Sequence, residues 1–167
     1  MGYPIEKTLN AIIEYDAGAP KRIQHLLKVY LFARLIGQAE GLDPRTMLIL
    51  EHTAAVHDIG IRKAEEVYGS SIGKYQEELG PAEADRLLTE LGLPRDVIDR
   101  ACWLIAHHHT YSDIQELDHQ ILVEADFLVN LYEKGEPADV QRSVYRSIFK
   151  TDAGKRLFRL HFPQACE

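Results

Sequence analysis

The segment from Ala54 to Gly60, AAVHDIG, places an imidazole beside a carboxylate where an apolar helical run ends, just before a glycine. Burial of an ionisable side chain is costly unless that side chain is paired or bound to a metal. The adjacent His57 and Asp58 therefore constrain the fold, because the chain has to bring partners to both. We interpret the pair as part of a divalent-metal site, and we expect Gly60 to support the turn that lets both reach one ion.

Helical periodicity dominates the rest of the chain, and prolines and glycines stand where helices begin and end. This pattern predicts an all-α protein, a single-domain helical bundle of about seven or eight helices over residues 1–167. The expected helices cover about residues 4–16, 20–40, 44–60, 81–92, 94–107 and 118–133, with one or two more in 138–162. Residues 61–80 are the least regular part, because Gly69, Ser70, Ser71 and Gly73 indicate a loop.

Composition limits the classes of function. The formal net charge of −7 gives no basic face for an extended nucleic acid. No apolar run has the length of a membrane span, no signal peptide is recognisable, and Cys102 and Cys166 do not suggest a disulfide framework. We expect a cytoplasmic protein without membrane or extended nucleic-acid partners, and the sequence leaves homodimer formation open.

Ligand-type side chains interrupt two further apolar faces. His25 lies on the apolar face of the expected helix 20–40, and Asp126 shares one helical stripe with Leu122 and Val129. An isolated buried carboxylate is costly or becomes protonated, whereas a metal ion keeps it ionised. Two imidazoles and two carboxylates without a thiolate favour Mn, Fe, Co, Ni or Zn. The predicted metal ligands are His25, His57, Asp58 and Asp126.

The order of these residues resembles the HD-domain superfamily of metal-dependent phosphohydrolases. The resemblance covers about residues 21–132, through IQHLLKVYLFARLIGQAEGLD, LEHTAAVHDIG, ADRLLTELGLPRDVIDRACWLIAHHHT and ILVEADFLV, with C-terminal helices in 133–167. It implies an HD-type fold, the same four metal ligands, and hydrolysis of a small phosphorylated substrate, with a nucleotide as the preferred candidate, by metal-activated water. Two-metal members commonly carry a histidine about where this chain has Gly80 and Pro81, so one ion is expected rather than two.

Histidines near the end of the expected helix 94–107 are candidates for the same site. Asp58 is expected to accept a proton as well as to bind metal, and His108 or His109 to hold the phosphate or the leaving group. The dipole at a solvated helix end also favours imidazolium, which is a purely structural explanation for this run of histidines. Of the other histidines, we expect His119 and His161 at the surface.

Three cations follow the HDIG segment closely in the sequence. Arg62, Lys63 and Lys74 are therefore candidate phosphate-binding residues, since arginine offers a bidentate fork and lysine a point charge. Lys74 is the preferred candidate, because the preceding Gly73 lets backbone amides approach an oxyanion.

Two other functions stay open at the level of sequence. The first is a non-catalytic, metal-containing module that senses a nucleotide, which the missing histidine near Gly80 keeps possible. The second is a diiron oxygenase variant of the same fold, which the incomplete second site disfavours. The number of bound metal ions and turnover of nucleotides would distinguish these alternatives.

Overall fold

The structure is a computed structural model that describes residues 2–166, and over this range the chain forms nine α-helices, one short 3-10 helix and no strand. The elements are α1 (Ile5–Tyr15), α2 (Pro20–Ala39), α3 (Pro44–Val56), α4 (Gly60–Tyr68), α5 (Gly73–Glu90), α6 (Arg95–His107), α7 (Leu117–Glu133), α8 (Ala138–Ile148), α9 (Asp152–His161) and η1 (Pro163–Cys166). The predicted all-α class is confirmed. Within residues 2–166, no helix combines the length and apolar character needed to cross a bilayer.

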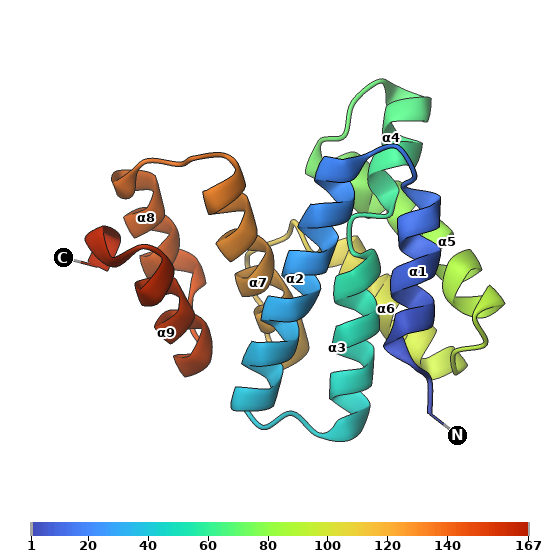
Figure 1. Ribbon diagram of the computed structural model, residues 1–167, viewed down its shortest axis with the longest axis horizontal. Coiled ribbons are helices and arrows are strands. Elements are labelled where there is room, and N and C mark those ends of the chain that lie inside the picture. The colour runs from blue at the N-terminus through green and yellow to red at the C-terminus, as the bar shows by residue number, and fades with distance from the viewer. Residues whose placement is uncertain (1, 167) are drawn as a thin grey trace.

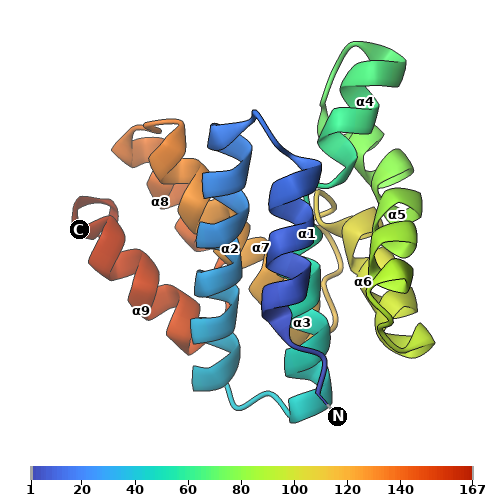
Figure 2. The same ribbon diagram turned by 45° about the vertical axis from the view of Figure 1, so that its right-hand side comes forward.

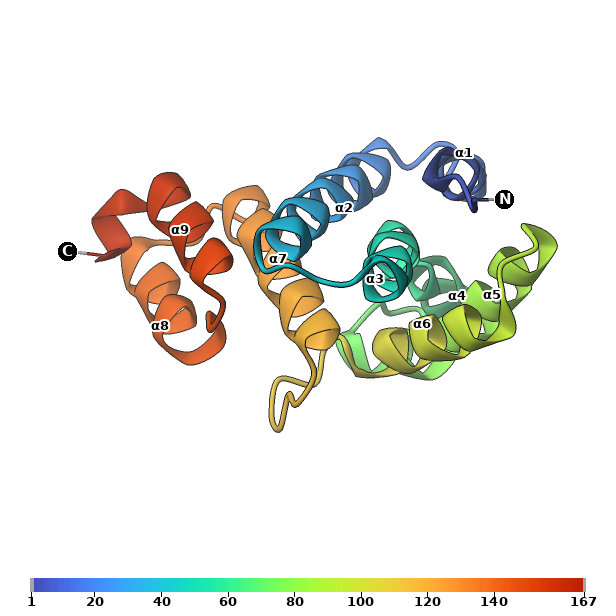
Figure 3. The same cartoon turned by 90° about the horizontal axis from the view of Figure 1, so that it is seen from below.

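Helix α3 lies between two apolar cores. Figure 1 shows α2 and α3 side by side in the middle of the molecule, with α1 next to α3 and with α8 and α9 at the opposite end. Leu50 and Ala54 of α3 belong to the core shared with α2 and α7, whereas Ala55 and Val56 belong to the core shared with α5 and α6. A helix that is apolar on more than one face is buried on more than one side. The end of α3 is thereby fixed from both directions (Figure 3).

The region around Pro81 is more helical than the sequence predicts. Residues 61–80, expected to be irregular, form most of α4 and the first part of α5, and α4 is the helix that raises the number to nine. Pro81 was expected to begin a helix, because an interior proline lacks an N–H and clashes with the preceding turn. Instead it lies inside α5, which packs against both α4 and α6. This packing keeps the helix continuous, while α4 projects beyond its neighbours (Figure 2).

Gly60 has a different role from the expected one. Its φ is not in the left-handed region, and the chain turns with right-handed residues, His57 at φ −57° and Ile59 at φ −56°. A Cβ at Gly60 would lie 2.8 Å from the carbonyl oxygen of Gln76 and 2.9 Å from the Cα of Gly80. Glycine is therefore needed because α4 begins in backbone contact with α5, next to Asp58.

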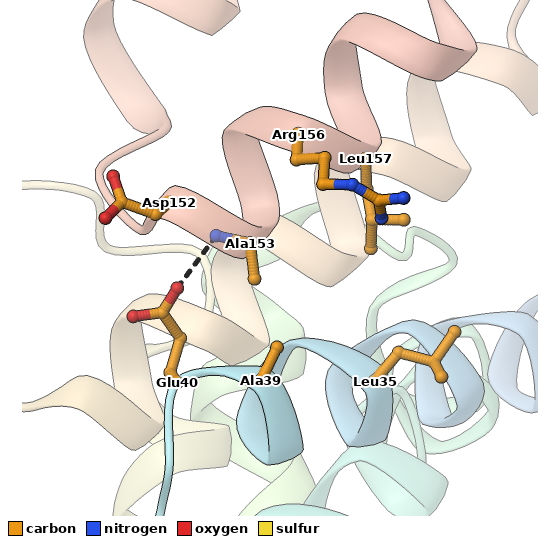
Figure 4. Close-up of a pocket in the computed structure, with 7 residues that line it drawn as sticks. All are labelled: Leu35, Ala39, Glu40, Asp152, Ala153, Arg156 and Leu157. Atoms are coloured by element: carbon orange, nitrogen blue, oxygen red, sulfur yellow. Dashed lines mark hydrogen bonds between the residues drawn. The ribbon is translucent and has the colours of Figure 1, made fainter.

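Two carboxylates hold the C-terminal helices. Glu124 of α7 is fully buried and accepts hydrogen bonds from Lys150 N (2.7 Å), Thr151 N (2.9 Å) and Thr151 Oγ1 (2.6 Å). Glu40, at the end of α2, accepts a hydrogen bond of 2.8 Å from the backbone N–H of Ala153 (Figure 4). Both carboxylates satisfy donors at the start of α9 that have no partner within the helix. They attach α9 to α7 and α2.

Replacing the buried carboxylate should destabilise this attachment. We expect Glu124→Gln to lower the free energy of unfolding by about 1–3 kcal/mol, because an amide N–H₂ would face a donor that the carboxylate now accepts from. Urea denaturation followed by circular dichroism measures the loss. The control is Glu90→Gln, an exposed residue of α5 that pairs with Arg86 one turn away, and this variant should change stability by less than about 0.5 kcal/mol. Equal losses in both variants would contradict the assignment.

A buried histidine joins α1 to α3. His52 Nε2 lies 3.3 Å from the carbonyl oxygen of Tyr3, and its Nδ1 lies 2.8 Å from Thr8 Oγ1. Because a carbonyl can only accept, Nε2 carries the proton and Nδ1 accepts from the threonine hydroxyl. Burial lowers the pKa of His52, so the neutral ring is the folded form.

Acid should therefore weaken this contact. Below the unfolded pKa of about 6.5 the unfolded chain takes up a proton on His52 that the folded chain excludes, so stability falls as the pH falls, by at most about 1.4 kcal/mol per pH unit. Urea unfolding of the unmodified protein and His52→Gln at about pH 7.5 and about pH 5.5 measures this effect. The stability difference between the two proteins should shrink at the lower pH, and a difference independent of pH would refute the assignment.

Candidate metal centre

The four predicted ligands meet at one place, although they come from α2, the end of α3 and the middle of α7. His25 Nε2 lies 3.1 Å from Asp58 Oδ2 and 3.1 Å from Asp126 Oδ1. His57 Nε2 lies 3.4 Å from Asp58 Oδ1 and 3.5 Å from Asp126 Oδ1. The two imidazole Nε2 atoms are 3.4 Å apart. The structure thus brings together side chains that are separated by up to a hundred residues in the sequence.

A tight turn after α3 lets adjacent residues share this place. Neighbouring residues of a regular helix diverge by about 100°, which is too wide for both to reach one ion. Here backbone hydrogen bonds connect residues three apart, as in a 3-10 turn, from Ile59 N to Val56 O (2.9 Å) and from Ile61 N to Asp58 O (3.0 Å). His57 and Asp58 consequently point to the same side.

Three histidines present the same nitrogen to the cluster. In each, Nδ1 faces a hydrogen-bond acceptor on the outer side, so Nε2 points inward and carries the lone pair whenever the ring is neutral. The acceptors are Ala54 O for His57 (2.8 Å), Ile105 O for His108 (2.7 Å) and Glu133 Oε2 for His25 (3.0 Å). This tautomer and orientation are typical of metal-binding histidines, whose other ring nitrogen is held by an outer partner.

His108 extends the cluster on the side of Asp58. It follows α6, its side chain is almost fully buried, and its Nε2 lies 3.4 Å from Asp58 Oδ1 without hydrogen-bond geometry. Over the described part of the chain this nitrogen has no hydrogen-bond partner. A buried polar atom without a partner indicates that a ligand or ion belongs beside it.

The charges of the cluster also fit a cation. Burial lowers the pKa of His25, but Asp126 and Asp58 outweigh this effect and raise it to about 11. Burial raises the pKa of both carboxyl groups, but the imidazoles of His57 and His25 outweigh it and hold both pKa values below the usual range. Two ionised carboxylates in a buried place thus require positive charge, from protons on the imidazoles or from a divalent ion. The nitrogen and oxygen donors present fit such an ion.

His109 stands beside the cluster but has both ring nitrogens occupied. Its Nε2 is 3.1 Å from Gln76 Oε1, and its Nδ1 is 3.2 Å from the hydroxyl of Tyr111. The amide nitrogen of Gln76 donates to Ser71 O at 2.7 Å, so its oxygen faces His109 and the His109 Nε2 carries a proton. Nδ1 then accepts from Tyr111, whose pKa is raised to about 12 by burial.

A second possible ligand group contains this histidine. One ligand atom each of Asp58, His108 and His109 lie within 4.8 Å of one another. Burial and the neighbouring His108 lower the pKa of His109 to about 4, so its ring is neutral. In the described arrangement, however, its single lone pair is already used by Tyr111. Asp58 and His108 therefore have free ligand atoms, and His109 does not.

Arg62 and Lys63 make contacts away from the cluster. The Arg62 guanidinium donates to the carbonyl oxygen of Tyr15 (3.0 Å), lies over the ring of Tyr15 and pairs with Glu66 (3.3 Å). Lys63 Nζ is 3.6 Å from the same glutamate. These contacts connect α4 to α1, and a substrate-binding role for either residue stays a prediction.

Lys74 is exposed in the first turn of α5, directly after a glycine that packs on the His109 ring. The preceding Gly73 packs on that ring, since a Cβ at this position would lie 2.8 Å from His109 Cγ. Ile72 precedes α5 without a side-chain cap, and the first turn of α5 has no acidic residue. A helix N-terminus with free N–H groups and a nearby lysine favours an anion. A substrate-binding role for Lys74 stays a prediction.

Of the two histidines expected at the surface, only one lies there. His119 is buried, not at the surface as predicted, and its Nε2 donates to the carbonyl oxygen of His107 (3.0 Å). Its ring also meets the edge of Trp103, so its role is to pack α7 against the end of α6. His161 is exposed, as predicted.

Three residues that contact the site were missed by the sequence analysis: Gln76, Tyr111 and Glu133. Glu133 could have been found, because it is two turns after Asp126 and lies on the same stripe of α7. Gln76 and Tyr111 carried no signal, since their importance comes only from their contacts with His109.

Comparisons with known proteins agree with this geometry. The family model of the HD domain matches residues 22–141. A crystal structure of a predicted HD superfamily hydrolase from an uncultured Thermotogales bacterium is similar in fold, with a TM-score of 0.68, 22% sequence identity, and coverage of 96% of this chain and 86% of that chain. No curated protein matches the sequence. The match to the HD-domain model spans most of the chain, which therefore belongs to the HD-domain family.

Proposed function

We propose that the protein is a metal-dependent phosphohydrolase whose metal ion is held by His25, His57, Asp58 and Asp126. The observation that carries this proposal is the convergence of two buried carboxylates and three Nε2 atoms, one of which, in His108, has no partner among the described residues. A set of nitrogen and oxygen ligands without sulfur favours Mn, Fe, Co, Ni or Zn. Membership of the HD-domain family supports a metal ion and a phosphorylated substrate.

The ligand geometry favours one ion. The second group, of Asp58, His108 and His109, depends on a histidine whose lone pair accepts from Tyr111 and whose N–H donates to Gln76. A second ion would have to displace one of these hydrogen bonds. We therefore propose one resident ion.

The residues around the ion can have separate roles in hydrolysis. When bound, a divalent ion lowers the pKa of water and polarises a phosphoryl oxygen. Asp58 directs one oxygen to His25 and the other to His57 and His108, so it can accept a proton on the side of His108. His108, with its proton fixed on Nδ1, keeps the Nε2 lone pair free to accept a hydrogen bond from water. His109 stays neutral and can steady the phosphate or the leaving group.

The substrate we propose is a small phosphorylated molecule, with a nucleotide as the preferred candidate. The uncapped N-terminus of α5 and Lys74 provide donors and positive charge beside His109. The net charge of −7 disfavours an extended nucleic acid.

Metal binding can be tested without a substrate. We expect about one metal equivalent per chain by elemental analysis after purification with added Mn or Zn, and a metal-dependent gain of about 2.7 kcal/mol in stability at a free-metal concentration 100 times Kd. Asp126→Asn should lose both the metal and the gain. The control His161→Ala changes an exposed histidine outside the cluster and should keep both. Full metal content in Asp126→Asn would remove that residue from the ligand set.

Hydrolysis can be tested with a panel of mono-, di- and cyclic nucleotides. We expect metal-dependent phosphate release, and His108→Ala should lower kcat by about 10²–10⁴-fold while the metal stays bound, because this variant loses an acceptor for the proton or the hydrogen bond of water. His107→Ala is the matched control, since that ring stacks on Trp103 outside the cluster. Nucleotide binding with no turnover by the metal-loaded protein would favour the sensing module instead.

A further inference from the structure

Glu133 connects the metal cluster to the surface. This glutamate ends α7, and its two oxygens have different partners: Oε2 is 3.0 Å from His25 Nδ1, and Oε1 is 2.8 Å from Lys28 Nζ. The His25 side chain is 8% exposed and the Glu133 side chain 27% exposed. The carboxylate therefore stands between a buried imidazole and a cation at the rim.

The ring of His25 lies between two carboxylates of the same helix. Asp126 and Glu133 are seven residues apart, which places them on one stripe of α7, two turns from each other. Asp126 Oδ1 is 3.1 Å from Nε2 of the ring, and Glu133 Oε2 is 3.0 Å from Nδ1. Rotation of the imidazole or exchange of its tautomer would break the second contact.

The orientation of His25 depends on a side chain, unlike that of the other two histidines. His57 and His108 donate from Nδ1 to the carbonyl oxygens of Ala54 and Ile105, which the regular backbone of α3 and α6 fixes. His25 lies inside α2, and the acceptor that its Nδ1 meets is a side chain instead of a backbone carbonyl. Among the residues described, Glu133 is that acceptor.

We propose that Glu133 is a positioning residue of the metal centre, which holds the proton of His25 on Nδ1 so that Nε2 is directed to the ion. Lys28, one turn after His25 on α2, holds the second oxygen of the carboxylate and keeps it turned to the ring. The inference rests on the proposed metal site. Outer partners of metal-binding histidines typically change metal affinity by about 10–100-fold when they are replaced.

A purely structural role predicts different behaviour. If the carboxylate served only to pair α7 with α2 through Lys28, then removal of either partner would have the same effect, and metal affinity would follow stability. Lys28→Met removes the ion pair and leaves the contact between Glu133 and His25 intact. It is therefore the matched control for Glu133→Leu, which removes both contacts.

The test measures metal affinity by competition with a chelator, together with thermal unfolding of the metal-free protein. We expect Glu133→Leu to raise the metal Kd by about 10–100-fold, and Lys28→Met by less than about 3-fold. Glu133→Gln should recover part of the affinity, since its amide oxygen can still accept from Nδ1. In the zinc-loaded protein, ¹⁵N spectra of the His25 ring should show the proton on Nδ1 in the unmodified chain and a weaker, exchanging signal in Glu133→Leu.

The possible failures are distinguishable. Absence of metal binding by the unmodified chain would overturn the proposed metal site. Normal binding in all variants would leave that site intact and overturn the role of Glu133. Equal losses of affinity and of metal-free stability in Glu133→Leu and Lys28→Met would also overturn it, in favour of a simple ion pair.

Discussion

The structure depends on the need of two buried carboxylates for positive charge at one point. Asp58 follows α3 and Asp126 lies within α7, and both face imidazoles from α2 and from the end of α3. Neither carboxylate could stay ionised in an apolar interior alone. The interaction therefore stabilises the packing of these three helices, because this arrangement places each carboxylate beside imidazoles. A divalent ion held by these residues would supply the same positive charge and could activate water.

The site joins a rigid part and a part held by side chains. His57 and His108 are oriented by carbonyl oxygens of helices whose apolar faces fill the two cores, so their direction is fixed by the fold itself. On the other side, the start of α5 and the segment after α6 are joined by hydrogen bonds that run from Ser71 O through Gln76 and His109 to Tyr111. His57 and His108 are thus preorganised by the fold, whereas His25 is oriented by the side chain of Glu133. The side chains at the start of α5 and after α6 are the ones that can rearrange when a substrate binds.

The sequence predicted what depends on residue type and local pattern. His25, His57, Asp58 and Asp126 were identifiable because an ionisable side chain on an apolar helical face needs an explanation, and the HDIG order gave the family. Local pattern failed where distant packing decides. Pro81 indicated a helix start, yet α4 and α6 on either side of α5 keep the helix continuous. Gly60 indicated a turn, yet its role is the backbone contact between α4 and α5. Gln76 and Glu133 have ordinary neighbours in sequence, and their partners are 33 and 108 residues away.

Our proposal of one ion instead of two rests on the hydrogen bonds of a single imidazole. His108 and His109 are adjacent histidines, but their ring nitrogens differ in their hydrogen-bond partners. The inward nitrogen of His108 has no partner in the described range, whereas His109 accepts from Tyr111 and donates to an amide whose orientation is set by Ser71 O. Binding of an ion to His109 would require reversal of its tautomer, which leaves Gln76 Oε1 facing a lone pair, or loss of the Tyr111 contact. Either change leaves a polar group unsatisfied in a partly buried place. The hydrogen bonds around His109 therefore favour a one-ion hydrolase over a two-iron oxygenase, and they do so through Gln76 and Tyr111 as well as through the histidine missing near Gly80.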